Sequence, residues 1–207
     1  MREYNVDKMV TYLRGFFQGA NMSESMHALG FALTKHAGQT RKGSGQPFVV
    51  HPLQMACYAV ALDIKDDHIL ATILLHDVCE DTGFPVSALP FSKDVVRGVR
   101  YMTFSMHPNE EKADAKVRYF KELLESRAAL ICKAIDRYMN LSSMLGALDD
   151  EAIIKNVKET DELLLPVLKE AKEKWPELSN LLYILRTNIR SVNDTLAFIY
   201  KIELTNS

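Results

Sequence analysis

The sequence predicts an all-α protein, a bundle of about eight to ten helices. Apolar residues recur at spacings of three and four over most of the chain, and this is the pattern of amphipathic helices. No stretch bounded by turn residues alternates between apolar and polar side chains over the length of a strand, so no β-sheet is expected. Serine, aspartate, glycine and proline residues punctuate the periodic segments and define the helix ends.

In the first part of the chain, capping residues, glycines and prolines set the expected helix boundaries. Residues 21–23 form a capping segment between a helix over residues 3–19 and a second helix that Gly38 closes. A glycine-bearing loop then leads to His51 and Pro52. Because proline favours the first position of a helix, we expect His51 at the N-cap of the third helix.

The fourth helix is expected to begin apolar and to end in charges. Asp66 or Asp67 caps it, and residues 69–75 form its apolar part. We expect it to continue unbroken through residue 81 and to stop at Gly83.

The remaining helices follow from the same signals. Ser126 is the expected cap of a strongly periodic helix that carries Asp136 in its apolar middle. Pro166 should kink or break the helix that follows. The expected helices lie over residues 92–102, 110–124, 126–146, 149–175 and 177–202.

Length and composition indicate a single soluble domain over residues 1–207. The 207 residues are 47% hydrophobic and 25% charged, as is usual for globular proteins. The motifs described below lie between residues 25 and 145. We expect the apolar helices of residues 147–207 to complete the bundle, with a dimer face as the alternative use of their apolar stripes.

Charge and cysteine usage exclude several classes of protein. A formal net charge of −2 argues against a general nucleic-acid or membrane-surface binder. The three cysteines stand singly on apolar helical stretches, without a C-x-x-C pair, which indicates a reducing compartment. Neither a signal peptide nor an apolar run of about 20 residues is present, so we expect a cytoplasmic protein. The sequence does not decide whether the protein forms a homo-oligomer.

The charged end of the fourth helix is the first candidate site. In a continuous helix His76 stacks on Glu80 and Asp77 stacks on Asp81, because residues four apart share a face. An imidazole and three carboxylates so close together resist desolvation unless a cation holds them, and a divalent metal would do so. The alternative is a solvated acidic helix end in which His76 caps the core.

Two further residues extend this candidate to a four-ligand set. His51, His76, Asp77 and Asp136 would bring two imidazoles and two carboxylates from three helices. Such a nitrogen and oxygen set suits Mn²⁺, Fe²⁺ or Zn²⁺ better than Ca²⁺ or Mg²⁺. The alternative for Asp136 is an internal ion pair with Arg137 or Lys133, since a carboxylate in an apolar helix needs a partner.

These motifs resemble those of a known family. The order of HAGQTRK at residues 36–42, GQPFVVHP at residues 45–52, ATILLHDVCEDT at residues 71–82 and AIDRYMN at residues 134–140 is similar to that of the HD superfamily. Within that superfamily it resembles the hydrolase domain of the RelA/SpoT alarmone enzymes and the free-standing small alarmone hydrolases. The resemblance covers about residues 25–145.

The resemblance implies a fold, an activity and a role for each matching residue. It implies an HD-type helical domain that releases the 3′-pyrophosphate of guanosine 3′,5′-bis(diphosphate), with one divalent ion, Mn²⁺ by preference. The implied roles are metal ligation by His51, His76, Asp77 and Asp136, activation of water by Glu80 and Asp81, and nucleotide contacts by Arg41, Lys42, Ser44 and Asn140.

Four functions of different kinds are therefore weighed, and the fourth, after the three described next, is a metal-stabilised structural bundle without nucleotide affinity. The leading hypothesis is an enzyme of the alarmone-hydrolase type, acting on a small nucleotide. The second is an HD-type phosphohydrolase of another nucleotide, such as a deoxynucleotide or a phosphorylated dinucleotide. The third is a helical module that senses a nucleotide without turnover, against which the Glu80–Asp81 pair argues, because a pure binder needs no water-activating carboxylate.

Overall fold

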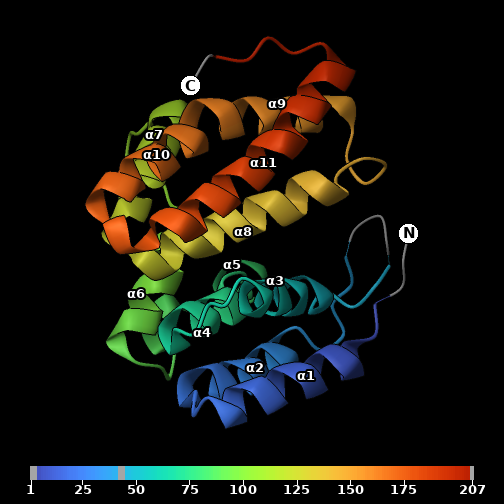
Figure 1. The fold of residues 1–207 in the computed structure, drawn as a ribbon, viewed down its shortest axis with the longest axis vertical. Coiled ribbons are helices and arrows are strands. Elements are labelled where there is room, and N and C mark those ends of the chain that lie inside the picture. The colour runs from blue at the N-terminus through green and yellow to red at the C-terminus, as the bar shows by residue number, and fades with distance from the viewer. Residues whose placement is uncertain (1–3, 42–44, 206–207) are drawn as a thin grey trace. The chain divides into compact units, whose positions relative to one another are not determined.

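The computed structural model describes residues 4–41 and 45–205, and within them the prediction of an all-α fold is confirmed (Figure 1). The described residues form helices and connecting loops. Among them, Thr40 and Pro47 form an isolated antiparallel β-bridge. In chain order the elements up to residue 102 are α1 (Val6–Gly19), α2 (Ser23–Lys35), α3 (Val50–Ala61), α4 (Asp67–Leu75), α5 (Val78–Thr82), η1 (Val86–Ala88) and α6 (Lys93–Met102).

The elements after residue 102 follow the predicted order as well. They are α7 (Lys112–Glu122), η2 (Leu123–Glu125), α8 (Arg127–Ser143), α9 (Asp150–Glu159), η3 (Thr160–Leu164), α10 (Leu165–Lys174), η4 (Pro176–Leu178) and α11 (Ser179–Tyr200).

The chain divides into two compact units. The first contains Met1–Phe104 and Glu125–Cys132, and the second contains Ser105–Leu124 and Lys133–Ser207. Helix α8 therefore begins in the first unit and ends in the second. That the chain forms a single domain stays a prediction.

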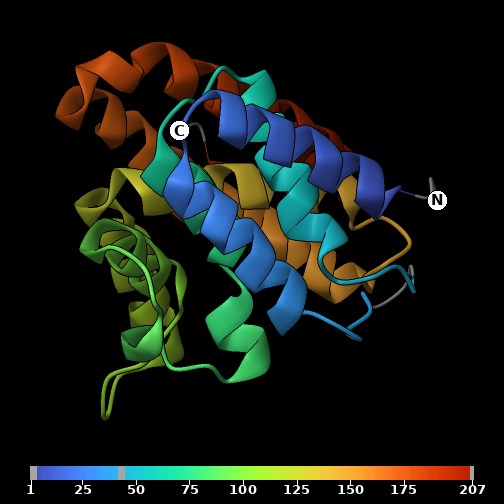
Figure 2. The ribbon, with the colours of Figure 1, turned by 90° about the horizontal axis from the view of Figure 1, so that it is seen from below.

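In the first unit, α4 is the central buried element. Helices α1 and α2 form a hairpin, α3 contacts both α1 and α4, and α4 also contacts α2 and α6 (Figures 1 and 2). Every side chain from Ile69 to Leu75 is buried, as expected for a helix covered on all sides. The apolar helix α4 ends at Leu75, and the charged segment of residues 76–81 follows it directly.

A close approach between α4 and α6 depends on Gly98. A Cβ atom built on this residue would lie 2.4 Å from Oγ1 and 2.9 Å from Cγ2 of Thr72, which is buried on α4. A side chain larger than hydrogen therefore cannot be accommodated unless the side chain of Thr72 or one of the two helices moves. The missing side chain lets α6 cover α4 directly.

The start of α2 corrects one predicted cap. Residues 21–23 do not supply a capping side chain, because Met22 is the N-cap and Asn21 has a positive φ of 56°. The carboxylate of Asp67 performs this task from the first turn of α4: it accepts from the amides of Glu24 at 3.0 Å and Ser25 at 2.7 Å. A partner more than 40 residues away in sequence thus satisfies the amides that a helix start leaves unpaired.

Several other predicted boundaries are confirmed. Asp66 accepts from the amides of His68 and Ile69 at the start of α4, and Ser126 accepts from the amide of Ala129 at the start of α8. In the second unit, the predicted interruption at Pro166 takes the form of the short π-helix η3, which ends two residues before the proline. Proline lacks the amide that a regular helix would require at that point.

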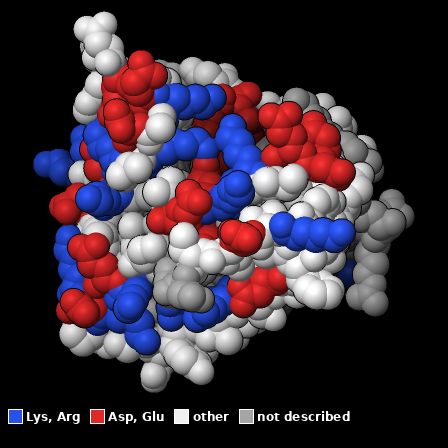
Figure 3. Space-filling view, turned by 90° about the horizontal axis from the view of Figure 1, so that it is seen from above, with Lys and Arg blue, Asp and Glu red and all other residues white. Residues whose placement is uncertain are grey.

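The charged surface is mixed in the part that Figure 3 shows. Lysine, arginine, aspartate and glutamate side chains are interspersed on this face, in keeping with the formal net charge of −2. Among the described residues no helix combines the length and the apolarity required to cross a bilayer.

Candidate metal centre

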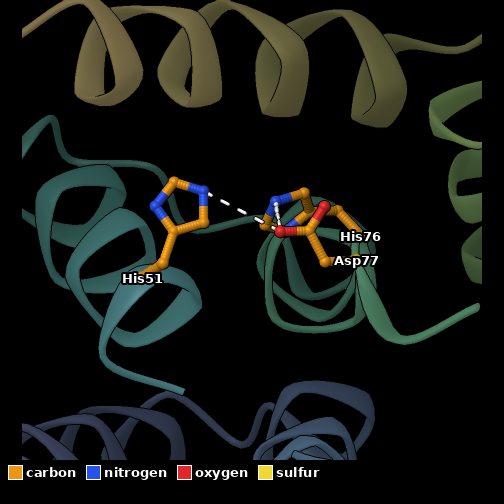
Figure 4. A group of neighbouring side chains, drawn as sticks. All are labelled: His51, His76 and Asp77. Atoms are coloured by element: carbon orange, nitrogen blue, oxygen red, sulfur yellow. Dashed lines mark ion pairs between the residues drawn. The ribbon is translucent and has the colours of Figure 1, made fainter. Parts of the chain in front are cut away.

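Three of the four predicted metal ligands converge in the first unit. His51 comes from α3, while His76 and Asp77 occupy the turn between α4 and α5 (Figure 4). Oδ2 of Asp77 lies 2.9 Å from Nε2 of His76 and 4.0 Å from Nε2 of His51. One ligand atom from each of the three residues lies within 4.8 Å of the others.

Both imidazoles are shielded from water. His51 is 4% and His76 is 2% exposed, whereas the Asp77 side chain keeps 26% of its surface. The trio therefore has a buried nitrogen side and a more open oxygen side. Ligands arranged in this way can hold an ion at the rim of a packed core.

The backbone fixes which nitrogen of His76 is available. Nδ1 of His76 lies 2.8 Å from the carbonyl oxygen of Ile73, which can only accept, so Nδ1 carries the proton. In the neutral ring Nε2 then presents a lone pair, and this atom faces Asp77. A hydrogen bond from the second ring nitrogen to a carbonyl is the usual way in which proteins orient metal-ligating histidines.

The same contact accounts for a correction. The predicted unbroken helix through residue 81 is wrong, because α4 ends at Leu75 and α5 begins at Val78. In an uninterrupted helix the carbonyl of Ile73 would accept from the amide of Asp77. The side chain of His76 competes for that carbonyl at the point where the helix breaks. Asp77 and Asp81 still keep a helical relation, since the amide of Asp81 donates to the carbonyl of Asp77 at 2.9 Å.

The position of His51 is also corrected. Val49 is the N-cap of α3, so His51 is the second helical residue rather than the cap. Pro52 is tolerated as the third, because the first amides of a helix have no intrahelical acceptor. His51 is held inside the first turn and its ring lies 5.3 Å from that of His76, centroid to centroid.

The donor set fits a divalent cation. A lone pair of His76 and a carboxylate oxygen of Asp77 face each other at 2.9 Å, and two such acceptors require a proton or a cation between them. His51 brings a second imidazole to the same oxygen. Two imidazoles and a carboxylate are ligands that Mn²⁺, Fe²⁺ and Zn²⁺ all accept.

Glu80 and Asp81, the predicted water-activating pair, lie on the short helix α5 next to the trio. Both side chains are exposed, and Oε1 of Glu80 accepts from the backbone amide of Phe104 at 2.6 Å. Burial raises the pKa of Asp81 above its ordinary value, and the negative charge of Asp77 raises it further, while His36, His76 and His51 oppose this shift.

The loop that carries Arg41 is closed by backbone hydrogen bonds. The amide of Arg41 donates to the carbonyl of Gln46 at 2.8 Å, and the amide of Gly45 donates to the carbonyl of Arg41 at 3.1 Å. Gly45 has a φ of +67°, which suits glycine in a tight return. Lys42 and Ser44, the other predicted nucleotide contacts of this loop, lie outside the described residues.

Asp136 and Asn140 lie in the second unit, on the part of α8 that follows Cys132. Asp136 is 6% exposed; its Oδ2 pairs with Nζ of Lys133 at 3.0 Å and its Oδ1 accepts from Nδ2 of Asn140 at 2.6 Å. The internal ion pair with Lys133 is thus present, whereas Arg137 donates to Glu159 at 2.6 Å. The roles of Asp136 as a metal ligand and of Asn140 as a nucleotide contact stay predictions.

Two contributors to the site, both backbone groups, were not singled out from the sequence. The carbonyl of Ile73 and the amide of Phe104 are backbone groups, which carry no residue-type signal. His36 and Gln39 lie within the motif that resembles the family, and the structure joins them to Asp81. Their presence in that motif was the signal.

The histidine–aspartate doublet between α4 and α5 and the histidine from α3 agree with the arrangement expected from the resemblance to the HD superfamily. No family model matches the chain. A probable GTP pyrophosphokinase of Mycobacterium leprae is 30% identical over 184 residues, which cover 85% of this chain and 23% of that protein. A guanosine-3′,5′-bis(diphosphate) 3′-pyrophosphohydrolase of Aquifex aeolicus is 31% identical over 165 residues, which cover 73% of this chain and 23% of that protein.

A solved structure gives the same result for the fold. It is that of a metazoan ortholog of SpoT, described as hydrolysing ppGpp, with a TM-score of 0.53 and 26% identity, covering 73% of this chain and 95% of that one. The chain spans about a quarter of the length of the curated relatives it matches. The predicted resemblance is thus confirmed: the chain is homologous to the HD-domain hydrolases of the RelA/SpoT type.

Proposed function

We propose that this protein is a metal-dependent phosphohydrolase that removes the 3′-pyrophosphate from guanosine 3′,5′-bis(diphosphate). The observation that carries the proposal is the convergence of His51, His76 and Asp77 beside the acid pair of α5. The relatives named for this hydrolysis support the choice of substrate.

We propose Mn²⁺ as the ion. His51, His76 and Asp77 would hold it, and Asp136 is proposed as the fourth ligand from its place in the motif. A divalent ion at this site would polarise phosphate oxygens and lower the pKa of a water molecule from about 15.7 towards about 7. The backbone contact of His76 keeps its Nε2 directed at the site.

The acid pair supplies the proton acceptor. Asp81 combines an exposed carboxylate with a raised pKa, which brings its basicity closer to neutral pH. Glu80 holds the amide of Phe104 through one oxygen and thereby ties α5 to the segment after α6. We assign proton abstraction from the attacking water to this pair.

The nucleotide contacts are proposed from the motif. Arg41 offers a planar cation that can stack on a base or bind a phosphate with two hydrogen bonds. Lys42, Ser44 and Asn140 complete the proposed binding set. We further propose, from net charge and cysteine usage, that the protein acts in the cytoplasm on a small nucleotide rather than on nucleic acid or a membrane.

The test is turnover by the purified full chain. With Mn²⁺ and guanosine 3′,5′-bis(diphosphate), we expect release of pyrophosphate, followed by ³¹P NMR, and no release after addition of a chelator. Release of orthophosphate from other nucleotides in a panel would instead identify another HD-type phosphohydrolase. Nucleotide binding without any product would identify a sensing module, and either outcome would contradict the proposal.

A further inference from the structure

The short helix α5 depends on contacts from outside itself. It has five residues, and a helix of this length is not stable alone. Oε1 of Glu80 accepts from the amide of Phe104, and the carbonyl of Asp81 accepts from Nε2 of Gln39 at 3.4 Å. The second contact satisfies one of the carbonyls that the last turn of a helix leaves unpaired.

Gln39 is in turn oriented by His36. Nδ1 of His36 lies 2.7 Å from Oε1 of Gln39, and because that oxygen can only accept, Nδ1 is the donor. This leaves Nε2 of Gln39 free to turn towards Asp81. The three residues thus form one chain of hydrogen bonds, from the end of α2 to the end of α5.

The imidazole of His36 is a fixed support. Its residue is 2% exposed, and its ring stacks on that of Phe48 at 4.8 Å with 30° between the planes. The amide of Phe48 donates to the carbonyl of Gln39 at 2.9 Å, which closes the loop that bears Arg41. The same histidine therefore supports both the loop with the proposed nucleotide contact and the helix with the proposed proton acceptor.

We propose that His36 is a positioning residue: acting through Gln39, it holds residues 39–41 and 45–48 in register with the Asp81 end of α5. The proposal rests on the proposed function, since it assigns His36 a part in that hydrolysis. It assigns no contact between His36 and the substrate. That His36 lies near the Asp81 carboxyl agrees with its influence on the pKa of that group.

His36→Phe is the first test, because it keeps a ring against Phe48 and removes the donor to Gln39. The matched control is His27→Phe, also on α2, where the ring of His27 lies 4.6 Å from that of Phe91. We expect kcat to fall about tenfold to a hundredfold in His36→Phe, as for a misplaced catalytic group, and to stay within about twofold in the control.

A second readout is independent of turnover. Hydrogen exchange of the backbone amides of residues 39–41, 45, 46 and 48 should quicken in His36→Phe and remain unchanged in His27→Phe. A protein without turnover on any nucleotide would reject the proposed function, and exchange would still decide whether His36 supports the loop. Unchanged exchange in a folded His36→Phe protein would overturn the inference.

Gln39→Leu tests whether His36 acts through Gln39. Its loss in kcat should resemble that of His36→Phe, and the double variant should lose no more than the single ones, because both remove the same chain of contacts. Multiplicative losses would contradict the inference. Gln39 is half-buried, so this variant also serves if His36→Phe fails to fold.

His36→Asn is the conservative variant. The asparagine amide places an N–H donor close to the position of Nδ1, so kcat should recover to within about threefold of wild type. His36→Gln, whose amide reaches the position of Nε2 instead, should not recover. Recovery by glutamine and not by asparagine would show that Nε2 carries the role and would overturn the assignment to Gln39.

Discussion

The two units surround a partly or fully buried carboxylate with different groups. In the first unit Asp77 faces two imidazoles, with His76 at 2.9 Å and His51 at 4.0 Å. In the second unit Asp136 is paired with the ammonium group of Lys133 at 3.0 Å and with the amide of Asn140 at 2.6 Å. The chain itself supplies a permanent cation to Asp136, whereas histidine is charged only when protonated.

This difference separates stability from metal binding. In the first unit Nε2 of His76 and a carboxylate oxygen of Asp77 present lone pairs to each other, and such a pair gains from an added divalent ion. The Lys133–Asp136 pair is complete without one. Burial alone would lower the pKa of Lys133, but Tyr119 and Asp136 hold it above its ordinary value, so Lys133 stays charged at neutral pH.

The largest effect is expected on activity, from changes to the trio. His76→Ala or Asp77→Asn removes a ligand and should lower kcat/KM by about a thousandfold or more, measured as pyrophosphate release. His68→Ala, on α4 and with 45% of its side-chain surface exposed, is the matched control and should keep wild-type activity. Turnover retained by Asp77→Asn would contradict the assignment of Asp77 to metal binding and, with it, the contrast with Asp136.

The next effect is expected on the stability of the second unit. Lys133→Met leaves the Asp136 carboxylate buried without its ammonium, which should lower the free energy of unfolding by about 2–3 kcal/mol. Urea unfolding measures the change. Combining it with Asp136→Leu should recover most of the loss, and a double variant as unstable as Lys133→Met would show that the pair is not the cause.

A packing change in the first unit is expected to affect both stability and metal binding there. Gly98→Ala places a Cβ atom against Thr72 and should destabilise the protein by about 1–3 kcal/mol and weaken metal binding, because α4 positions the doublet. Thr72→Ala should relieve the clash in the double variant. Gly30→Ala, at a helical site with no atom within 4 Å, should instead stabilise by up to about 1 kcal/mol.

The smallest effect concerns a partly buried ion pair of the second unit, between Arg118 and Glu110. Hydrogen bonds from Arg118 and from the backbone of His107 lower the pKa of Glu110 from 4.5 to about 2. Its contribution to stability is therefore present above about pH 4.5 and is lost as the pH falls towards 2. Glu110→Gln should lower Tm slightly at pH 7 and not at pH 2, while Glu173→Gln should change Tm at neither.

The fold could be predicted from the sequence where a boundary has a local cause. Asp66, Ser126 and Asp149 cap the helices that follow them, and Pro166 interrupts its helix, because each effect acts within a few residues. The cap of α2 could not be predicted, because its carboxylate comes from Asp67, far along the chain.

The candidate site divides in the same manner. The doublet and His51 were recognisable by residue type and order. The break at residues 76–77 was not, since it involves the carbonyl of Ile73, and a carbonyl is common to every residue. The pairing of Lys133 with Asp136 was foreseen only as one of two alternatives, because sequence spacing does not decide between Lys133 and Arg137.

The central claim is that His51, His76 and Asp77 form the core of a divalent metal site. Titration of the metal-free protein with Mn²⁺, with free ion followed by electron paramagnetic resonance, tests it most directly. One ion should bind per chain in the wild-type protein, and that binding should be lost in Asp77→Asn. Equal binding by the two proteins, or none by the wild type, would contradict the claim.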